Sequence, residues 1–386
     1  MIIGIPREIL ENERRVAALP ENVAKYAAKG YKVLVEASAG EGALRSDDEY
    51  RKAGAEIVTD KKALFSRSDV ILKVKQPTLD GKVGMHEVEM LREGTILVTF
   101  LHPAAPPNHG MVRKLCERNI TAFTMDGIPR TSRAQMMDAL TSMSTITGYK
   151  SVIIAANRLP KFIPMIGTAI GTIKPAAILV VGAGVVGLQA IATAKRLGGV
   201  VKVVEIRDDA RKSAESLGAK VVWCDVPAEL ALGEGGYARA LPPGWLEKER
   251  AAIKPLAAEA DIIILCALVP SEVAPILLTD EIVCGMKPGS VIVDVSIDQG
   301  GNCALTEAGQ EVVKHGVLIY GALNIPGSMP VHSSWLYANN MMYFIENMFK
   351  KGGDKPDMED DIVKHALVTH QRKIMHQGAL KAMNPA

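Results

Sequence analysis

One stretch of the sequence combines residue types and spacings that suit the binding of a dinucleotide. The apolar run 178–181 is followed by Gly182, Gly184 and Gly187 in the pattern G-x-G-x-x-G. Glycines at these positions allow a tight turn, the close approach of a pyrophosphate and a close contact between helix and strand. A helix that starts after the turn directs its free N–H groups and the positive end of its dipole toward the phosphates. The stretch therefore predicts a strand, a phosphate-binding turn and a helix, in that order.

An acidic residue follows at a distance that suits ribose recognition. Glu205 stands 18 residues after Gly187, at the end of the next apolar run. A carboxylate there accepts hydrogen bonds from the hydroxyls of the adenosine ribose and repels a 2′-phosphate. This residue therefore favours NAD(H) over NADP(H). Arg207, two positions further on, carries a cation that could bind a phosphate, so the preference is not absolute.

A second candidate segment places a guanidinium, an amide and a carboxylate close together. Arg130 precedes a predicted helix, and Gln135 and Asp138 are three residues apart, so they share one helix face. Such a set can hold a carboxamide and a ribose through directional hydrogen bonds. An ordinary capping run with Thr131 or Ser132 as the N-cap explains the same residues. The residues alone leave both interpretations open.

Four more residues stand at the ends of predicted strands and could perform acid–base chemistry on a small acid. Arg15 and Lys75 could hold a substrate carboxylate, while His102 and Asp298 could move protons at the neighbouring carbon. Taken singly, each of the four is more often a solvated or structural residue.

The elements that would position these residues alternate between strand and helix. The first part of the chain predicts strands at 2–5, 32–36, 70–74, 95–100 and 120–124 and a helix at 20–29. The later part predicts strands at 178–181, 220–223, 261–266, 290–295 and 316–320. Two long helical patterns, at 132–157 and 331–350, connect the parts.

This pattern predicts an α/β protein with two Rossmann-like, doubly wound domains joined by two long helices, with the nucleotide cleft between them. The first domain comprises residues 1–139 and 327–386. The second, residues 140–326, is the expected NAD(H)-binding domain. Residues 225–246 are rich in glycine and proline around a single Tyr237, and they predict a mobile loop or a disordered surface insertion.

Composition excludes several classes of function. The net charge is +2 and aromatic residues make up 4% of the chain, which is not the profile of a nucleic-acid-binding protein. The five cysteines form no C-x-x-C pair, so a reduced protein without a zinc site is expected. The sequence contains no visible export signal and no clear membrane span, which suggests a cytoplasmic protein without direct membrane insertion.

These motifs together resemble one superfamily along essentially the whole chain. It comprises the alanine dehydrogenases and the NAD(H)-binding alpha subunit (domain I) of proton-translocating NAD(P) transhydrogenase. The segment from Pro129 to Ser142 is similar to the transhydrogenase loop that holds the nicotinamide, and Gly235-Gly-Tyr237-Ala is similar to the tip of its mobile loop. Thr141 stands where that segment commonly has a serine.

The resemblance implies roles for residues on several elements. Arg130, Thr131, Ser132, Gln135 and Asp138 would belong to the nicotinamide site. The pyrophosphate turn and the adenosine side would use Gly182, Gly184, Val185, Gly187, Glu205, Ile206 and Arg207, and Gly236, Tyr237 and Leu268 would close over the nucleotide. In an alanine dehydrogenase, Arg15, Lys75, His102 and Asp298 would instead be the catalytic set.

We favour the transhydrogenase interpretation, because an alanine dehydrogenase needs neither the Gly-Gly-Tyr loop nor the set around Arg130. The resemblance then implies a homodimer that passes hydride from NADH to NADP⁺ held by a partner subunit. A membrane-spanning partner would couple the transfer to proton translocation and hold this chain at the inner face of the cell membrane. The alternatives are an NAD-dependent alanine dehydrogenase and a non-catalytic NAD(H)-binding sensor.

Overall fold

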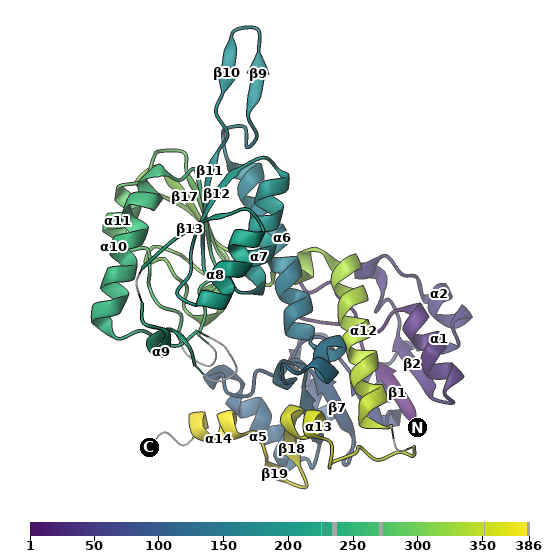
Figure 1. The fold of residues 1–386 in the computed structure, drawn as a ribbon. Coiled ribbons are helices and arrows are strands. Elements are labelled where there is room, and N and C mark those ends of the chain that lie inside the picture. Colours follow the sequence, from purple (N-terminus) through teal and green to yellow (C-terminus); the bar gives the residue numbers. More distant parts are fainter. Residues whose placement is uncertain (225, 234–237, 270–272, 351, 384–386) are drawn as a thin grey trace. The chain divides into compact units, whose positions relative to one another are not determined.

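Two mainly parallel sheets, whose central strands are apolar and buried on both faces, organise the chain (Figure 1). The computed structural model describes residues 1–224, 226–233, 238–269, 273–350 and 352–383. The chain divides into two compact units, Met1–Met143 with Pro326–Ala386, and Ser144–Ile325. The divisions fall near the positions 139/140 and 326/327 expected from sequence.

The first unit has an eight-stranded sheet in the order β19-β18-β8-β7-β4-β1-β2-β3. Its parallel strands are β1 (Ile2–Ile5), β2 (Lys32–Glu36), β3 (Ala55–Val58), β4 (Val70–Leu72), β7 (Ile96–Thr99) and β8 (Thr121–Thr124). The chain returns late to add β18 (Leu367–His370) and β19 (Lys373–Ile374) in antiparallel pairing, which the sequence did not predict. A separate hairpin pairs β5 (Leu79–Asp80) with β6 (Met85–His86).

Helices cover both faces of this sheet. One face packs on α1 (Pro20–Ala28), α2 (Asp47–Lys52), α12 (Pro330–Met348) and α13 (Asp361–Ala366), and the other packs on α3 (Lys61–Arg67), α4 (Glu87–Met90) and α5 (His109–Glu117). Alternate residues of one strand serve the two faces, since Val33 and Val35 join one cluster while Leu34 joins the other. The last helix is α14 (Gln377–Met383).

The second unit has a seven-stranded sheet in the order β13-β12-β11-β14-β15-β17-β16. The parallel strands are β11 (Ala177–Val181), β12 (Val200–Val204), β13 (Lys220–Val222), β14 (Ile262–Leu265), β15 (Val291–Asp294) and β17 (Val317–Gly321), with β16 (Glu311–Lys314) antiparallel at the edge. The parallel strands follow the order of a nucleotide-binding doubly wound sheet, in which ligands bind where the order reverses. That point lies between β11 and β14.

The sheet of the second unit is also covered on both faces. Side chains from α6 (Ala139–Arg158), α7 (Val185–Arg196) and α8 (Asp208–Ser216) join one apolar cluster, and those from α9 (Ala228–Ala231), α10 (Pro243–Glu259) and α11 (Asp280–Cys284) join the other. The doubly wound α/β fold predicted from sequence is confirmed for both units.

Three local features differ from the sequence prediction. The helix expected over 132–157 is broken, because a 3-10 turn, η4 (Ser132–Met137), precedes α6. The region 225–246 contains α9 and the start of α10, so its described part is not a single irregular loop. A two-stranded hairpin of β9 (Ile166–Thr168) and β10 (Gly171–Ile173) was not foreseen.

Close packing of α6 on α7 gives a first prediction. A Cβ at Gly148 of α6 would overlap with the carbonyl oxygen of Val186 in α7. We expect Gly148→Ala to lower the free energy of unfolding by about 2 kcal/mol, the usual cost of overpacking a core. Urea denaturation measures the loss. Gly110→Ala in α5 is the control, because a Cβ there has no described neighbour within 4 Å and alanine favours a helix. Equal stabilities of the two variants would contradict the prediction.

Candidate functional site

The turn between β11 and α7 is built around three glycines with different requirements. Gly182 has a φ of +95°, and a Cβ there would lie 2.9 Å from the carbonyl oxygen of Cys266. A Cβ at Gly187 would overlap with the carbonyl oxygen of Gly182, so strand and helix meet too closely for any side chain. Gly184 is the N-cap of α7, and apart from its chain neighbours the only described atom within 4 Å of its would-be Cβ is Nη2 of Arg207, at 4.0 Å. These environments match the three glycine roles of a dinucleotide turn.

Val185 is the first residue of α7, at the end of the helix whose N–H groups have no intrahelical acceptor. Cys266 supports the turn from the neighbouring strand end. Its thiol is buried and donates to the carbonyl oxygens of Val181 and Gly182, at 3.2 Å each. Burial raises the pKa of this thiol well above its usual range, so it stays protonated and remains a donor. No motif in the sequence indicated this contact.

Glu205 follows β12 and is 4% exposed. Its Oε2 accepts from the backbone N–H of Ala183 at 2.7 Å, and its Oε1 accepts from that of Arg207 at 2.9 Å. The Arg207 side chain also donates to both oxygens, from Nε at 3.1 Å and from Nη2 at 2.9 Å. Ile206, between them, packs into the core cluster on one face of the sheet. The structure thus joins the predicted acid directly to the glycine turn.

Two buried polar residues fix the loops that follow β14 and β15. The amide of Asn302 accepts from the backbone N–H of Ala267 at 3.0 Å and donates to the carbonyl oxygens of Ala267 and Pro275 at 2.9 Å each. Asp294 accepts from the backbone N–H groups of Asn302 and Cys303, at 2.9 and 3.1 Å. They hold the backbone beside the half-buried Leu268, which the resemblance places at the nucleotide.

The segment that the resemblance assigns to the nicotinamide lies on the first unit. Arg133 pairs with Asp360 at 2.6 Å, and Asn340 donates to the carbonyl oxygen of Met136 at 2.8 Å, so η4 is fixed to its own unit. The side chains at the predicted positions face outward, since Arg130, Thr131, Ser132 and Gln135 are all exposed. The anchors were not predicted, and they fix the backbone of a segment whose side chains at these positions are exposed.

The continuous helix expected over 132–157 is interrupted at Asp138, and α6 begins at the next residue. Oδ1 of Asp138 accepts from the backbone N–H of Thr141 at 2.8 Å, and its Oδ2 accepts from the Thr141 hydroxyl at 2.6 Å. A side chain that binds an N–H of the first turn starts a new helix at the next residue. Thr131 occupies the N-cap position of η4, as the capping alternative expects, but its side chain makes no capping hydrogen bond.

Three of the four residues expected for acid–base chemistry lie in the first unit, and Asp298 is exposed in η6 (Ile297–Gln299) of the second unit. Arg15 is 3% exposed and binds Glu13 through Nε at 2.8 Å and Nη2 at 2.5 Å. Burial raises the pKa of Glu13, but the bonds from Arg15 outweigh it and the net pKa is lowered. The Arg15 guanidinium is therefore already paired with the ionised carboxylate of Glu13. Lys75 is half-buried.

His102 is held by its backbone and by its ring. Its φ is +43°, and its Nδ1 lies 3.4 Å from Oδ2 of Asp126. The ring stacks on Phe100 with centroids 5.7 Å apart. Burial raises the pKa of Asp126, but His102 and Thr124 outweigh it and hold that pKa well below the usual range. Asp126 therefore stays ionised and orients the imidazole, a contact that sequence reasoning missed.

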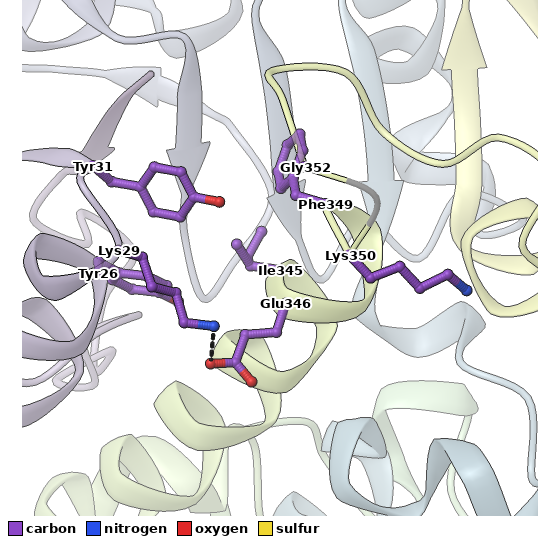
Figure 2. A pocket seen from close by; sticks show the side chains of 8 residues that line it. All are labelled: Tyr26, Lys29, Tyr31, Ile345, Glu346, Phe349, Lys350 and Gly352. Atoms are coloured by element: carbon purple, nitrogen blue, oxygen red, sulfur yellow. Dashed lines mark ion pairs between the residues drawn. The ribbon is translucent and has the colours of Figure 1, made fainter.

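A cavity of about 240 Å³ also lies in the first unit, between α1 and the end of α12 (Figure 2). Its walls carry Tyr26, Tyr31, Ile345 and Phe349, with the Lys29–Glu346 ion pair of 2.7 Å at its side. None of the described residues predicted to bind nucleotide or substrate lines it. The cavity is separate from the candidate site.

Two predicted residues, Gly236 and Tyr237, lie outside the described part of the chain. Within the described part, no group of three or more histidine, cysteine, aspartate or glutamate residues is arranged to hold a metal ion. A search of the described helices finds none with the length and apolar character needed to cross a membrane.

Comparison with known proteins places the chain in a family. Residues 4–147 match the model of the alanine dehydrogenase/PNT N-terminal domain, and residues 151–377 match that of the C-terminal domain. The chain belongs to the alanine dehydrogenase/PNT family. The resemblance drawn from the sequence motifs is therefore confirmed.

Members of the alanine dehydrogenase/PNT family differ in how close they are to this chain. It is 42% identical over 379 residues to an NAD(P) transhydrogenase subunit alpha polypeptide of Rhodospirillum rubrum, covering 97% of this chain and 98% of that one. A transhydrogenase structure from Sinorhizobium meliloti superposes with a TM-score of 0.83 at 37% identity, covering 98% of this chain and 99% of the other. An L-alanine dehydrogenase structure gives the same TM-score at 28% identity, covering 99% of both chains.

A buried carboxyl of α10 gives a pH-dependent prediction. Burial and the charge of Glu205 raise the pKa of Glu249 to about 7 from a usual 4.5. The folded state thus favours the protonated acid, and its stabilising contribution is full below pH 4.5 and lost as the pH rises through 7. We expect Glu249→Gln to raise the free energy of unfolding by about 2 kcal/mol at pH 8 and by little at pH 4.5. Urea denaturation at both pH values measures the difference.

The control for this prediction lies on the same helix. Glu247 forms an exposed ion pair with Arg250, so Glu247→Gln should show no such gain at pH 8. A stabilisation by Glu249→Gln that is the same at both pH values would show that burial of an ionised Glu249 is not its cause.

Proposed function

We propose that this chain is the NAD(H)-binding subunit of a proton-translocating NAD(P) transhydrogenase. The observation that carries the proposal is the near-complete mutual coverage with a transhydrogenase subunit alpha polypeptide at 42% identity. An alanine dehydrogenase structure matches nearly the whole chain as well, so coverage does not distinguish the two functions. Sequence identity favours the transhydrogenase, at 37% against 28% for the two structures.

The resemblance to the transhydrogenase subunit suggests a separate role for each group of predicted site residues. In this proposal the glycine turn and Val185 bind the pyrophosphate, and Glu205 binds the adenosine ribose, with Ile206 and Arg207 on the same adenosine side. Arg130, Gln135 and Asp138 hold the nicotinamide end, with Thr131 and Ser132 beside it. Gly236, Tyr237 and Leu268 close over the nucleotide.

The proposed reaction moves a hydride from the dihydronicotinamide ring of NADH to the nicotinamide ring of NADP⁺. The C–H bond of NADH breaks as the new C–H bond forms, and no proton is exchanged with the protein. Such a transfer depends on alignment of the two rings and on exclusion of water. The outward-facing side chains of Arg130 and Gln135 suit this task, because they are exposed on a segment whose backbone is anchored.

The partners follow from the same proposal. NADP(H) would lie on a second subunit, and a membrane-spanning subunit would couple the transfer to proton movement and hold the chain at the cytoplasmic face of the cell membrane. The β9–β10 hairpin supports the proposed homodimer, because its apolar side chains Ile170 and Ile173 are exposed and a second copy would cover them.

Alanine dehydrogenase activity is the second candidate, favoured by the contact between His102 and Asp126. In that reaction the histidine would accept a proton while two cations hold the carboxylate. The Arg15–Glu13 pair weakens this candidate, since one of the two cations is already neutralised.

One assay separates the two candidates. We expect the purified chain to transfer hydride from NADH to an NADP⁺ analogue only after an NADP(H)-binding transhydrogenase subunit is added, and to show no NAD⁺ reduction with L-alanine. Absorbance of the reduced analogue and of NADH measures both reactions. Alanine oxidation that His102→Ala abolishes would instead establish the dehydrogenase.

The role of Gln135 can be tested in the same assay. If Gln135 aligns the rings, Gln135→Ala should lower the rate of hydride transfer about tenfold or more and change the Kd of NADH by less than twofold, because alignment is needed only in the transition state. Gln310→Ala, at an exposed glutamine outside the site, is the control and should change neither. Equal losses of rate and binding would assign Gln135 to binding alone.

A further inference from the structure

The carboxylate of Glu205 is saturated by hydrogen-bond donors. A carboxylate has about four acceptor positions, two on each oxygen. Oε1 accepts from the backbone N–H and from Nε of Arg207, and Oε2 accepts from the backbone N–H of Ala183 and from Nη2 of Arg207. All four distances lie between 2.7 and 3.1 Å.

A ribose needs two of these positions if its two hydroxyls are to donate to Glu205. The two backbone donors belong to the glycine turn and to the start of α8, so they cannot leave without unfolding those elements. The two donors from the Arg207 side chain can leave by rotation of that side chain. The ribose and the Arg207 guanidinium therefore compete for the same acceptor positions.

The guanidinium of Arg207 also lies near the place where a pyrophosphate is expected to bind. Apart from its neighbours in the chain, the only described atom within 4 Å of the would-be Cβ of Gly184 is Nη2 of Arg207. The middle glycine of such a turn is the point of closest approach to a pyrophosphate. Guanidinium groups bind phosphate with two parallel hydrogen bonds, so a short movement exchanges a carboxylate partner for a phosphate partner.

We propose that Arg207 competes with the adenosine ribose for Glu205 and transfers to the pyrophosphate when a dinucleotide binds. Arg207 is thereby a selectivity residue, because as long as it stays on Glu205 its charge reduces the repulsion that this acid would exert on a 2′-phosphate. The proposal rests on the proposed binding of NAD(H). Every adenosine ligand then binds less tightly than its own contacts would allow, because the Arg207 side chain must first leave Glu205.

Ligands that separate the ribose from the pyrophosphate test the exchange. We expect Arg207→Ala to bind adenosine about threefold to tenfold more tightly than the unaltered chain, because nothing must be displaced. The same variant should bind ADP about tenfold more weakly, because the phosphate partner is lost. Its preference for NADH over NADPH should rise by threefold or more. Isothermal titration calorimetry of the full chain measures all four ligands.

Three further variants serve as controls. Arg196→Ala, at an exposed arginine of α7, should leave all four affinities unchanged. In Glu205→Gln, a second substitution Arg207→Ala should no longer tighten adenosine, since the competition needs the carboxylate. Arg207→Lys keeps the positive charge but lacks the paired N–H groups of a guanidinium, so it should bind adenosine more tightly while it keeps part of the affinity for ADP. This variant replaces Arg207→Ala if the alanine variant fails to fold.

Unchanged or weaker adenosine binding by a folded Arg207 variant would overturn the exchange, as would tightening that persists in the Glu205→Gln chain. In both cases the unaltered chain still binds ADP and NADH, and the proposed function stands. Failure of the unaltered chain to bind ADP and NADH would overturn the exchange and the proposed function together.

Discussion

The contact between the backbone of Gly187 and the carbonyl of Gly182 constrains the whole second unit. No side chain fits between them, so α7 begins against the end of β11 and directs its first N–H groups beyond the carboxyl edge of the sheet. The thiol of Cys266 donates to the same carbonyl from the end of β14, the next strand of the sheet. Glu205 then reaches the turn from the end of β12 on the other side, through the N–H of Ala183. Three adjacent strands thus meet at one turn whose geometry is set by the absence of a Cβ.

In the first unit, by contrast, a lysine and two glutamates are buried next to one another. Lys73 follows β4 and is buried with Glu87 at 3.0 Å and Glu8 at 3.4 Å. These carboxylates raise the pKa of Lys73 although its burial acts against them, while burial raises the pKa of Glu8. Glu8 also accepts from the backbone N–H of Val74 at 2.7 Å, next to Lys75. Removing one partner of such a buried pair leaves an uncompensated charge, which costs far more than the pair itself gains. The network is therefore a rigid support for the strand end that carries Lys75.

Much of the fold could be predicted from sequence, because fully buried parallel strands have continuous apolar runs and the glycine spacing fixes the first turn of the second sheet. The antiparallel strands β16, β18 and β19 could not be predicted, since they are short and β18 pairs with β8, which lies far away in the sequence. The break at Asp138 depends on one side chain bonding to Thr141, which competes with a helical pattern that otherwise continues. Glu205 was identified from its distance to the turn, whereas the roles of Asp126, Asn302 and Cys266 needed the tertiary contacts that bring distant segments together.

One stacked pair has a practical consequence. The guanidinium of Arg211 lies 4.0 Å above the ring of Trp223, and its Nη1 donates to the carbonyl oxygen of Glu205 at 3.5 Å. Trp223 is 60% exposed and follows β13, so an indole is linked through one cation to the residue proposed to recognise the ribose. Cation stacking and solvent polarity both change indole emission. With Trp245 and Trp335 replaced, the chain would carry its own optical label at the adenosine end of the site, with no dye attached.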